Sequence, residues 1–169
     1  MSQTVLITGA SNGIGKACAR VFARKGYDLV LVARHREKLE AVKAELSEYD
    51  VNIKVVAMDL TGEDAAVDLY NNLVLDDISI DILVNNAGFG DHGAFHDSSW
   101  EKQKKMVLLN IMALMQMTYV FGQSMKLRKK GRILNVASIA GLCAGPYMST
   151  YYATKAFVLS FSESIAYEL

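Results

Sequence analysis

The sequence has no excess of either charge, and this absence excludes whole classes of partner. Lys and Arg together number 18, Asp and Glu together also number 18, and the formal net charge is zero. A balanced chain provides no electrostatic footprint for nucleic acid or for an anionic membrane. We therefore expect no nucleic-acid partner and no membrane partner.

Long apolar runs and paired cysteines are missing as well. The longest uninterrupted apolar runs have five residues, as in residues 29–33, whereas roughly 18 are needed to cross a bilayer. A strand-like run begins at Val5, without the basic and apolar regions of a secretion signal. Cys18 and Cys143 lie far apart and form no CxxC pair. These absences predict a soluble, reduced protein of the cytoplasm.

The residues that are present suffice for one folded domain. Hydrophobic residues make up 51% of the 169 positions, which is ample for a single buried core. No repeat, low-complexity tract or linker interrupts the chain. We therefore predict a single domain over residues 1–169.

Short apolar segments alternate with longer segments of helical period, which is typical of βαβ units and a parallel sheet. Right-handed crossovers then place the strands in the order 3-2-1-4-5, in a doubly wound α/β fold. The expected strands are 4–8, 28–33, 53–58, 81–85 and 131–137, and the expected helices are 13–25, 36–48, 63–74, 99–128 and 151 onward.

The last residues continue a helical pattern to Leu169 without a glycine or another stop signal. The fifth strand would also be left as an unpaired apolar edge. We therefore expect the sequence to be truncated after the helix that begins near residue 151.

A glycine-rich segment follows the first predicted strand and opens a helix. Such a turn lets the backbone approach a pyrophosphate, whose charge is then met by the N–H groups of the helix. Its spacing is GxxxGxG, and Ala17 stands where a Walker A loop needs Ser or Thr. The predicted cofactor-binding residues of this segment are Gly9, Ser11, Asn12, Gly13, Ile14 and Gly15.

The end of the second predicted strand points to the phosphorylated form of the cofactor. An Asp or Glu at this place would bind the ribose 2′-hydroxyl of NAD. Here Ala33 is followed by Arg34, His35 and Arg36, and a cation can pair with a 2′-phosphate. We therefore predict NADP in preference to NAD, with Arg34 as a binding residue. The alternative is that Arg34 and Arg36 simply solvate the start of a helix.

Three further segments follow strand ends, where doubly wound sheets bind ligands. Residues 85–88 end the fourth predicted strand, Ser138 follows the fifth, and Tyr151 and Lys155 are spaced i, i+4 on the last helix. A phenol has a pKa of about 10, and a neighbouring ammonium favours its ionised form. Ser138 can hold a substrate oxygen beside Tyr151. Together these residues predict a proton-transfer site next to a nicotinamide.

The whole set of motifs resembles the short-chain dehydrogenase/reductase family in its single-domain branch, from residue 4 to the last. The matching residues are the glycine segment 8–15, Asp59 with Leu60, the segment 85–88, Asn110, Ser138, Tyr151 and Lys155. The resemblance implies a Rossmann fold and a reaction that interconverts a carbonyl and an alcohol by hydride transfer.

The resemblance also implies a role for each residue. Tyr151 is the acid/base that donates a proton to the carbonyl, and Lys155 binds the nicotinamide ribose and tunes Tyr151. Ser138 orients the substrate oxygen, and Asn110 supports a water relay behind Lys155. Asp59 contacts the adenine, with Leu60 beside it, and Asn86, Ala87 and Gly88 line the cofactor cleft. A homodimer or homotetramer is the assembly that the family implies.

Simpler interpretations stay open for single residues. Ser138 alone could cap a turn, and Asn110 alone could satisfy backbone groups. His92 and His96 have no evident third ligand, so we expect no metal site. The basic cluster Lys126–Arg132 suits the C-terminus of a helix. For the whole protein, the alternative to an NADP(H)-dependent oxidoreductase is a dinucleotide-binding sensor or scaffold that lost turnover.

Overall fold

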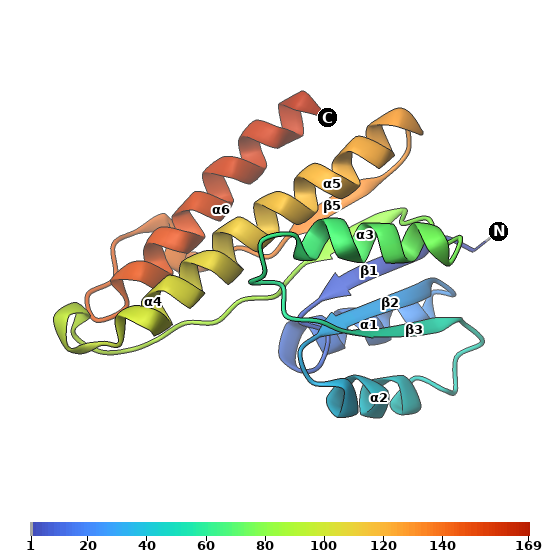
Figure 1. Cartoon of the computed structure of the whole chain (residues 1–169), viewed down its shortest axis with the longest axis horizontal. Coiled ribbons are helices and arrows are strands. Elements are labelled where there is room, and N and C mark those ends of the chain that lie inside the picture. The colour runs from blue at the N-terminus through green and yellow to red at the C-terminus, as the bar shows by residue number, and fades with distance from the viewer. Residues whose placement is uncertain (1) are drawn as a thin grey trace.

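The computed structural model describes residues 2–169 as a five-stranded parallel sheet between two layers of helices (Figure 1). The strand order is β3-β2-β1-β4-β5, so the predicted fold class and topology are confirmed. The strands are β1 (Thr4–Thr8), β2 (Asp28–Ala33), β3 (Ile53–Ala57), β4 (Ile82–Asn85) and β5 (Arg132–Asn135).

Helices connect and cover the strands. The short helices η1 and η3 were not predicted, whereas η2 lies within the predicted helix 99–128. The helical elements are α1 (Gly13–Arg24), α2 (Arg36–Glu45), α3 (Ala65–Leu75), η1 (Phe95–Asp97), α4 (Trp100–Val107), η2 (Leu108–Ala113), α5 (Leu114–Leu127), η3 (Ile139–Leu142) and α6 (Ser149–Glu168). Several predicted boundaries differ from the structure by one residue. Four differ by more: α2 ends three residues early, α3 begins two residues late, β5 ends two residues early, and α6 begins two residues early. Tyr151 therefore lies inside the first turn of α6.

Each face of the sheet has its own hydrophobic core. Along β1, Val5 and Ile7 pack with α1 and α2, whereas Leu6 packs with α3 and α5. Side chains of a strand point alternately to opposite faces, so a strand covered on both faces must be apolar throughout. The central strands β1, β2 and β4 are accordingly buried along nearly their whole length.

Elements α4, η2 and α5 form one helix of 28 residues, Trp100–Leu127. Its central segment η2 has π-helical hydrogen bonding, a feature that often marks functional positions in helices. By length and a hydropathy of 1.3, this helix could cross a membrane, although 44% of its most apolar stretch is buried inside the fold. The search for uninterrupted apolar runs in the sequence did not find this helix, because polar residues such as Asn110 and Thr118 divide its apolar stretch. A core helix of a folded domain passes the same test, and α5 packs on the sheet in this way.

All five strands end at the same edge of the sheet, because they are parallel. The segments that follow Thr8, Ala33, Ala57, Asn85 and Asn135 therefore meet there. This edge carries the candidate site.

Candidate active site

A cleft of about 500 Å³ runs along the carboxyl edge of the sheet. It is lined by most of the residues that the sequence predicts for cofactor binding and catalysis. Those that line it are Gly9, Ser11, Asn12, Ile14, Arg34, Asp59, Leu60, Asn86, Ala87, Gly88, Tyr151 and Lys155. Four predicted residues do not line it, namely Gly13, Gly15, Asn110 and Ser138.

The glycine turn is tied directly to the end of β4. The Thr8 hydroxyl accepts hydrogen bonds from the backbone N–H groups of Asn86 and Ala87, both at 2.9 Å. The side-chain amide of Asn86 donates to the carbonyl oxygens of Thr8 and Gly9, at 3.0 and 3.2 Å. Asn86 therefore fixes the position of the glycine turn and also lines the cleft.

Gly9 and Gly15 are required because the backbone is crowded there. A Cβ on Gly9 would lie 2.9 Å from the Cα of Ala87, and the φ of Gly9 is +65°. A Cβ on Gly15 would lie 2.3 Å from the carbonyl oxygen of Gly9. Gly15 thus acts behind the cleft, where it lets α1 pack against the turn. Gly13 has open space around it, and its φ of +50° explains the glycine.

The N-terminus of α1 is free to hold an anion. Asn12, its N-cap residue, makes no capping hydrogen bond through its side chain, and the first turn contains no acidic residue. The first N–H groups of a helix have no partner inside the helix and attract negative charge. The glycine cradle and this helix end fit a pyrophosphate on both shape and charge.

A group of basic side chains lies at the far end of the cleft, after β2. Arg34, His35 and Lys38 line this end, and neither Arg34 nor Lys38 forms an ion pair within residues 2–169. Arg36 does not line the cleft, and its guanidinium lies 3.5 Å from the Glu40 carboxylate. The positive charge available to a 2′-phosphate therefore comes from Arg34 and Lys38. Arg36 instead pairs with Glu40 on the same helix.

Asp59 lies beside these cations as an ionised acceptor. Partial burial by itself would raise its pKa, but hydrogen bonds from the N–H and hydroxyl of Thr61 and the charge of Arg34 outweigh burial. The pKa of Asp59 is thereby held below its ordinary range. Both Thr61 bonds go to Oδ1, at 3.0 and 2.9 Å, which leaves Oδ2 available to a ligand.

Of the two adjacent tyrosines of α6, Tyr151 faces the cleft. The chain after β4 passes close to its ring, since a Cβ on Gly90 would lie 3.1 Å from Tyr151 Cδ2. The ring of Tyr152 instead packs against Gly145, where a Cβ would lie 2.4 Å from it. The structure therefore distinguishes two residues of the same type by what covers each ring.

Lys155 is a buried cation next to Tyr151. Only 7% of Lys155 is exposed, and its Nζ donates a 2.7 Å hydrogen bond to the carbonyl oxygen of Val136. Nζ lies 5.9 Å from the centre of the Tyr151 ring, and no carboxylate neutralises it within residues 2–169. Burial lowers the pKa of Lys155. An ammonium held in this way attracts negative charge, such as a phenolate, and can donate its remaining N–H groups to hydroxyls.

Ser138 begins the short helix η3 as its N-cap. Its Oγ accepts a 3.1 Å hydrogen bond from the backbone N–H of Ala140, which is the turn-capping role left open above. The hydroxyl proton has no acceptor within residues 2–169 and remains available to a substrate oxygen. Its catalytic role stays a prediction.

Asn110 is buried within η2 and joins three segments. Its side-chain amide donates to the carbonyl oxygen of Phe89 at 2.9 Å and to the Thr154 hydroxyl at 3.1 Å. Its Oδ1 accepts from the N–H of Phe89 at 3.1 Å. Asn110 thus fastens the loop after β4 to α6, behind the cleft. The water relay stays a prediction.

Sequence reasoning missed several residues of the cleft. Val136 and Ala137 follow β5 and could have been found from the strand-end rule, had β5 been predicted to end at Asn135. Leu109 and Lys38 lie on helices and carried no signal of their own. The lining residues that were not predicted as cofactor-binding or catalytic are Ala33, His35, Lys38, Met58, Phe89, Gly90, Leu109, Val136 and Ala137.

His92 and His96 pack against aromatic rings. His92 stacks on Tyr147 with ring centres 6.0 Å apart, and His96 meets Phe95 edge to face. Among residues 2–169, no three His, Cys, Asp or Glu side chains are grouped so that they could hold a metal ion.

The sequence profile of the short chain dehydrogenase family matches residues 3–169. Among curated proteins, a very-long-chain 3-oxoacyl-CoA reductase of Coccidioides immitis is 37% identical over 171 residues, which cover 97% of this chain and 48% of that protein. The chain spans about half the length of the curated relatives that it matches first.

Solved structures resemble the whole chain as well. A bulky-bulky ketone specific alcohol dehydrogenase from Comamonas testosteroni superposes with a TM-score of 0.92 at 38% identity, over 99% of this chain and 67% of that one. A short-chain dehydrogenase from Sphingobium yanoikuyae in complex with NADPH has a TM-score of 0.92 at 39% identity, over 99% of this chain and 66% of that one.

Proposed function

The chain belongs to the short-chain dehydrogenase family, and from this membership and the geometry of the cleft we propose that it is an NADP(H)-dependent oxidoreductase. It interconverts a carbonyl and an alcohol. The observation that carries the proposal is the pair Tyr151 and Lys155, which lies on α6 in the wall of the cleft that begins at the glycine turn.

Each group of residues has one task in this reaction. The glycine turn and the N-terminus of α1 hold the pyrophosphate, and Arg34 with Lys38 holds the 2′-phosphate. When bound, the dinucleotide supplies the hydride that reduces the carbonyl carbon. Tyr151 donates the proton to the carbonyl oxygen, and the Lys155 ammonium stabilises the phenolate that remains. The free hydroxyl proton of Ser138 orients the same oxygen.

We infer that the substrate is a bulky, uncharged ketone. We call Tyr151 and Lys155 the catalytic wall of the cleft. The segment 133–154, which contains Tyr151 and directly precedes Lys155, has no charged side chain. Large apolar side chains are exposed in this segment, with Ile139 at 85%, Leu142 at 75% and Tyr147 at 61%. The similar alcohol dehydrogenase is described as specific for bulky-bulky ketones, and this likeness supports the same class here.

Turnover of a ketone panel by absorbance of the nicotinamide tests the proposal. We expect oxidation of NADPH with aryl alkyl and polycyclic ketones, and little with short keto acids. Cofactor binding without turnover of any ketone, aldehyde or alcohol would overturn the proposal that this protein is an enzyme. It would favour the alternative of a dinucleotide-binding sensor or scaffold. Assembly as a homodimer or homotetramer, and location in the cytoplasm, stay predictions of this proposal.

Cofactor choice has its own test in Arg34. The Arg34→Asp variant removes a cation and adds a carboxylate, so we expect NADPH affinity to fall by about tenfold or more, since a hydrogen bond to a charged group is worth about 1.5–3 kcal/mol. Affinity for NADH should stay the same or rise. The control is Arg36→Asp, which lies outside the cleft. Equal affinity of the unmodified protein for NADH and NADPH would contradict the preference.

A further inference from the structure

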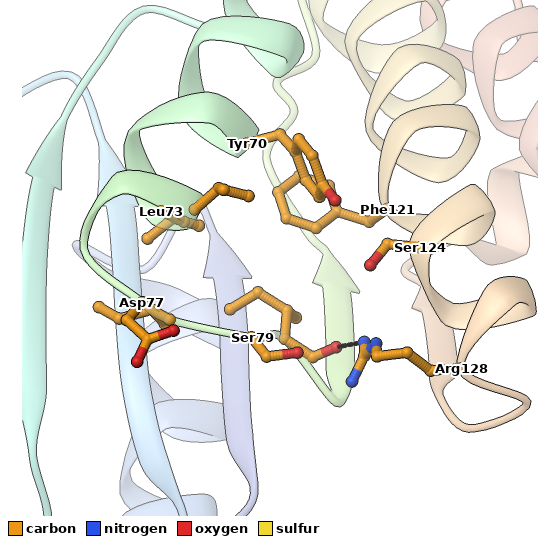
Figure 2. Close-up of a pocket in the computed structure, with 10 residues that line it drawn as sticks. Tyr70, Leu73, Asp77, Ser79, Phe121, Ser124 and Arg128 are labelled. Carbon is orange, nitrogen blue, oxygen red and sulfur yellow. Dashed lines mark hydrogen bonds between the residues drawn. The ribbon is translucent and has the colours of Figure 1, made fainter.

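A second pocket lies between α3 and α5, at the amino edge of the sheet and therefore opposite the cofactor cleft. Its volume is about 150 Å³. We call it the α3–α5 pocket (Figure 2). It is lined by Tyr70, Leu73, Val74, Asp77, Ile78, Ser79, Ile80, Phe121, Ser124 and Arg128. Nothing in the proposed oxidoreductase reaction uses these residues.

The end of α3 shapes this pocket. Asp77 takes a left-handed conformation, with φ of +58°, and the N–H of Ile78 donates to the carbonyl oxygen of Leu73 at 2.8 Å. This is a Schellman motif, in which a left-handed residue turns the chain back over the helix end. The turn brings residues 78–80 to the same pocket as side chains of α3 and α5. The two helices pack together through Tyr70 and Phe121, and the hollow lies beside this contact.

The floor of the pocket is apolar and partly aromatic. Leu73 is 1% exposed and Phe121 is 2% exposed, and the ring of Phe121 meets that of Tyr70 edge to face at 5.5 Å. An enclosed apolar cavity of about 150 Å³ holds one benzene ring, and this pocket has that volume with an apolar floor, a polar rim and an opening to solvent. The pocket therefore fits an apolar body of one ring.

The rim offers hydrogen-bond donors that the protein leaves unused. The hydroxyls of Tyr70, Ser79 and Ser124 have no hydrogen-bond partner within residues 2–169, and Figure 2 shows the Ser124 hydroxyl between Phe121 and Arg128. The Arg128 guanidinium donates through Nη2 to the carbonyl oxygen of Ile80. A guanidinium has five N–H donors, so several remain for a ligand.

The charge around the pocket favours an anion at the Arg128 end. Arg128 belongs to the basic cluster Lys126–Arg132, which holds five cations. The Asp81 carboxylate offsets part of this charge, because it lies 3.6 Å from Arg128 and 3.0 Å from Lys130. The carboxylate of Asp77 lies on the opposite side of the pocket from Arg128 (Figure 2). An anionic group would thus bind beside Arg128 and Ser124, away from Asp77.

We propose that the α3–α5 pocket binds a small organic monocarboxylate with an apolar body about one ring in size. The body packs on Leu73, Ile78 and Phe121. The carboxylate accepts hydrogen bonds from the free N–H groups of Arg128 and from the Ser124 hydroxyl.

Titration of the protein with benzoate, with and without NADPH and followed by amide NMR, tests this proposal. We expect saturable shifts at Ser79, Ser124 and Arg128, with the amides of the cofactor cleft unchanged. Benzylamine and benzyl alcohol, which share the ring and lack the carboxylate, should bind about tenfold or more weakly, since hydrogen bonds to a charged group are the stronger ones. Equal binding of the three compounds, or the absence of saturable shifts at these residues, would overturn the proposal.

Two variants and one control locate the site. Arg128→Gln removes the charge, and Ser124→Leu fills the hollow while it keeps the bond between Arg128 and Ile80; each should abolish the benzoate shifts. Lys126→Gln removes a neighbouring cation that does not line the pocket, and binding should stay within twofold. A loss as large in Lys126→Gln as in Arg128→Gln would show general attraction to the basic cluster and would overturn the site. Because binding is measured without turnover, this result is independent of the proposed function.

Discussion

The phosphate-binding turn is built from backbone, whereas the catalytic wall of the cleft is built from side chains. At the turn, backbone meets backbone, and the missing side chains of Gly9 and Gly15 are what the geometry needs. At the wall, Tyr151 and Lys155 extend from α6 as side chains. A change at the turn should therefore disturb folding and cofactor binding together, whereas a change at the wall should lower turnover without a loss of stability.

The largest expected effect is on turnover in Tyr151→Phe. In the proposed reaction, loss of the phenolic hydroxyl removes the proton donor to the carbonyl oxygen, and general acid catalysis contributes about 10²- to 10⁴-fold. We expect kcat to fall by that factor and the Kd of NADPH to stay within about twofold, since only one of the many groups lining the cleft is changed. Steady-state kinetics and fluorescence titration measure the two quantities.

Tyr152→Phe is the matched control, because that ring packs against Gly145 outside the cleft. Its kcat should be unchanged. Retained turnover in Tyr151→Phe, or an equal loss of turnover in Tyr152→Phe, would contradict the assignment of Tyr151 as the proton donor.

Next in size is Gly15→Ala at the turn. The new Cβ would lie 2.3 Å from the Gly9 carbonyl oxygen, so α1 must shift. Overpacking of this kind costs about 1–3 kcal/mol, more than the roughly 1 kcal/mol by which alanine improves a helix. We expect the free energy of unfolding and the NADPH affinity to fall together.

The control for Gly15→Ala is Gly62→Ala, where the nearest atom would be an ordinary 3.7 Å away. Urea unfolding should not detect a loss there. A Gly15→Ala protein with unchanged NADPH affinity would show that the turn tolerates the shift.

A comparable loss of stability is expected for Asn110→Ala, which cuts the connection between the two parts of the cleft. Three hydrogen bonds to Phe89 and Thr154 disappear, and buried partners left unpaired cost about 1–3 kcal/mol. Thermal unfolding should report the loss, and the exposed Asn71→Ala should not. Stability equal to the parent would mean that these bonds are replaced by others.

The smallest effect on stability, and one of opposite sign, is expected for Lys155→Met. Burial lowers the pKa of Lys155, so the charged form costs stability at neutral pH. As pH rises from the folded pKa toward the unfolded value of about 10.4, the unfolded chain binds more protons and the parent gains stability. The variant should thus be the more stable at pH 7, by a margin that shrinks in alkali, while turnover is lost.

Unfolding at pH 7 and pH 10 measures that margin, with the exposed Lys25→Met as the control. A margin that does not change with pH would show that burial of the ammonium is not its cause. If Lys155→Met is more stable but less active than the parent, Lys155 contributes to the reaction and lowers the stability of the fold. This result would sharpen the contrast between the wall and the turn.

The sequence by itself determined the fold class, the strand order and most of the cleft. Apolar runs and helical periods are local patterns, and parallel strands bring all their carboxyl ends to one edge, so Gly9, Arg34 and Asn86 could be placed together from the sequence. Asp59 was placed there by the resemblance to the family. The i, i+4 spacing put Tyr151 and Lys155 on one face of a helix for the same reason.

Only the tertiary structure decided what each residue meets across the fold. That a side chain at Gly15 would collide with Gly9, that Asn110 joins the loop after β4 to α6, and that Lys38 reaches the cleft all depend on how the folded chain packs. The α3–α5 pocket depends on them too, since its floor comes from two helices that the sequence does not pair. Such contacts are set by how closely backbones approach, and residue spacing along the chain carries no measure of that distance.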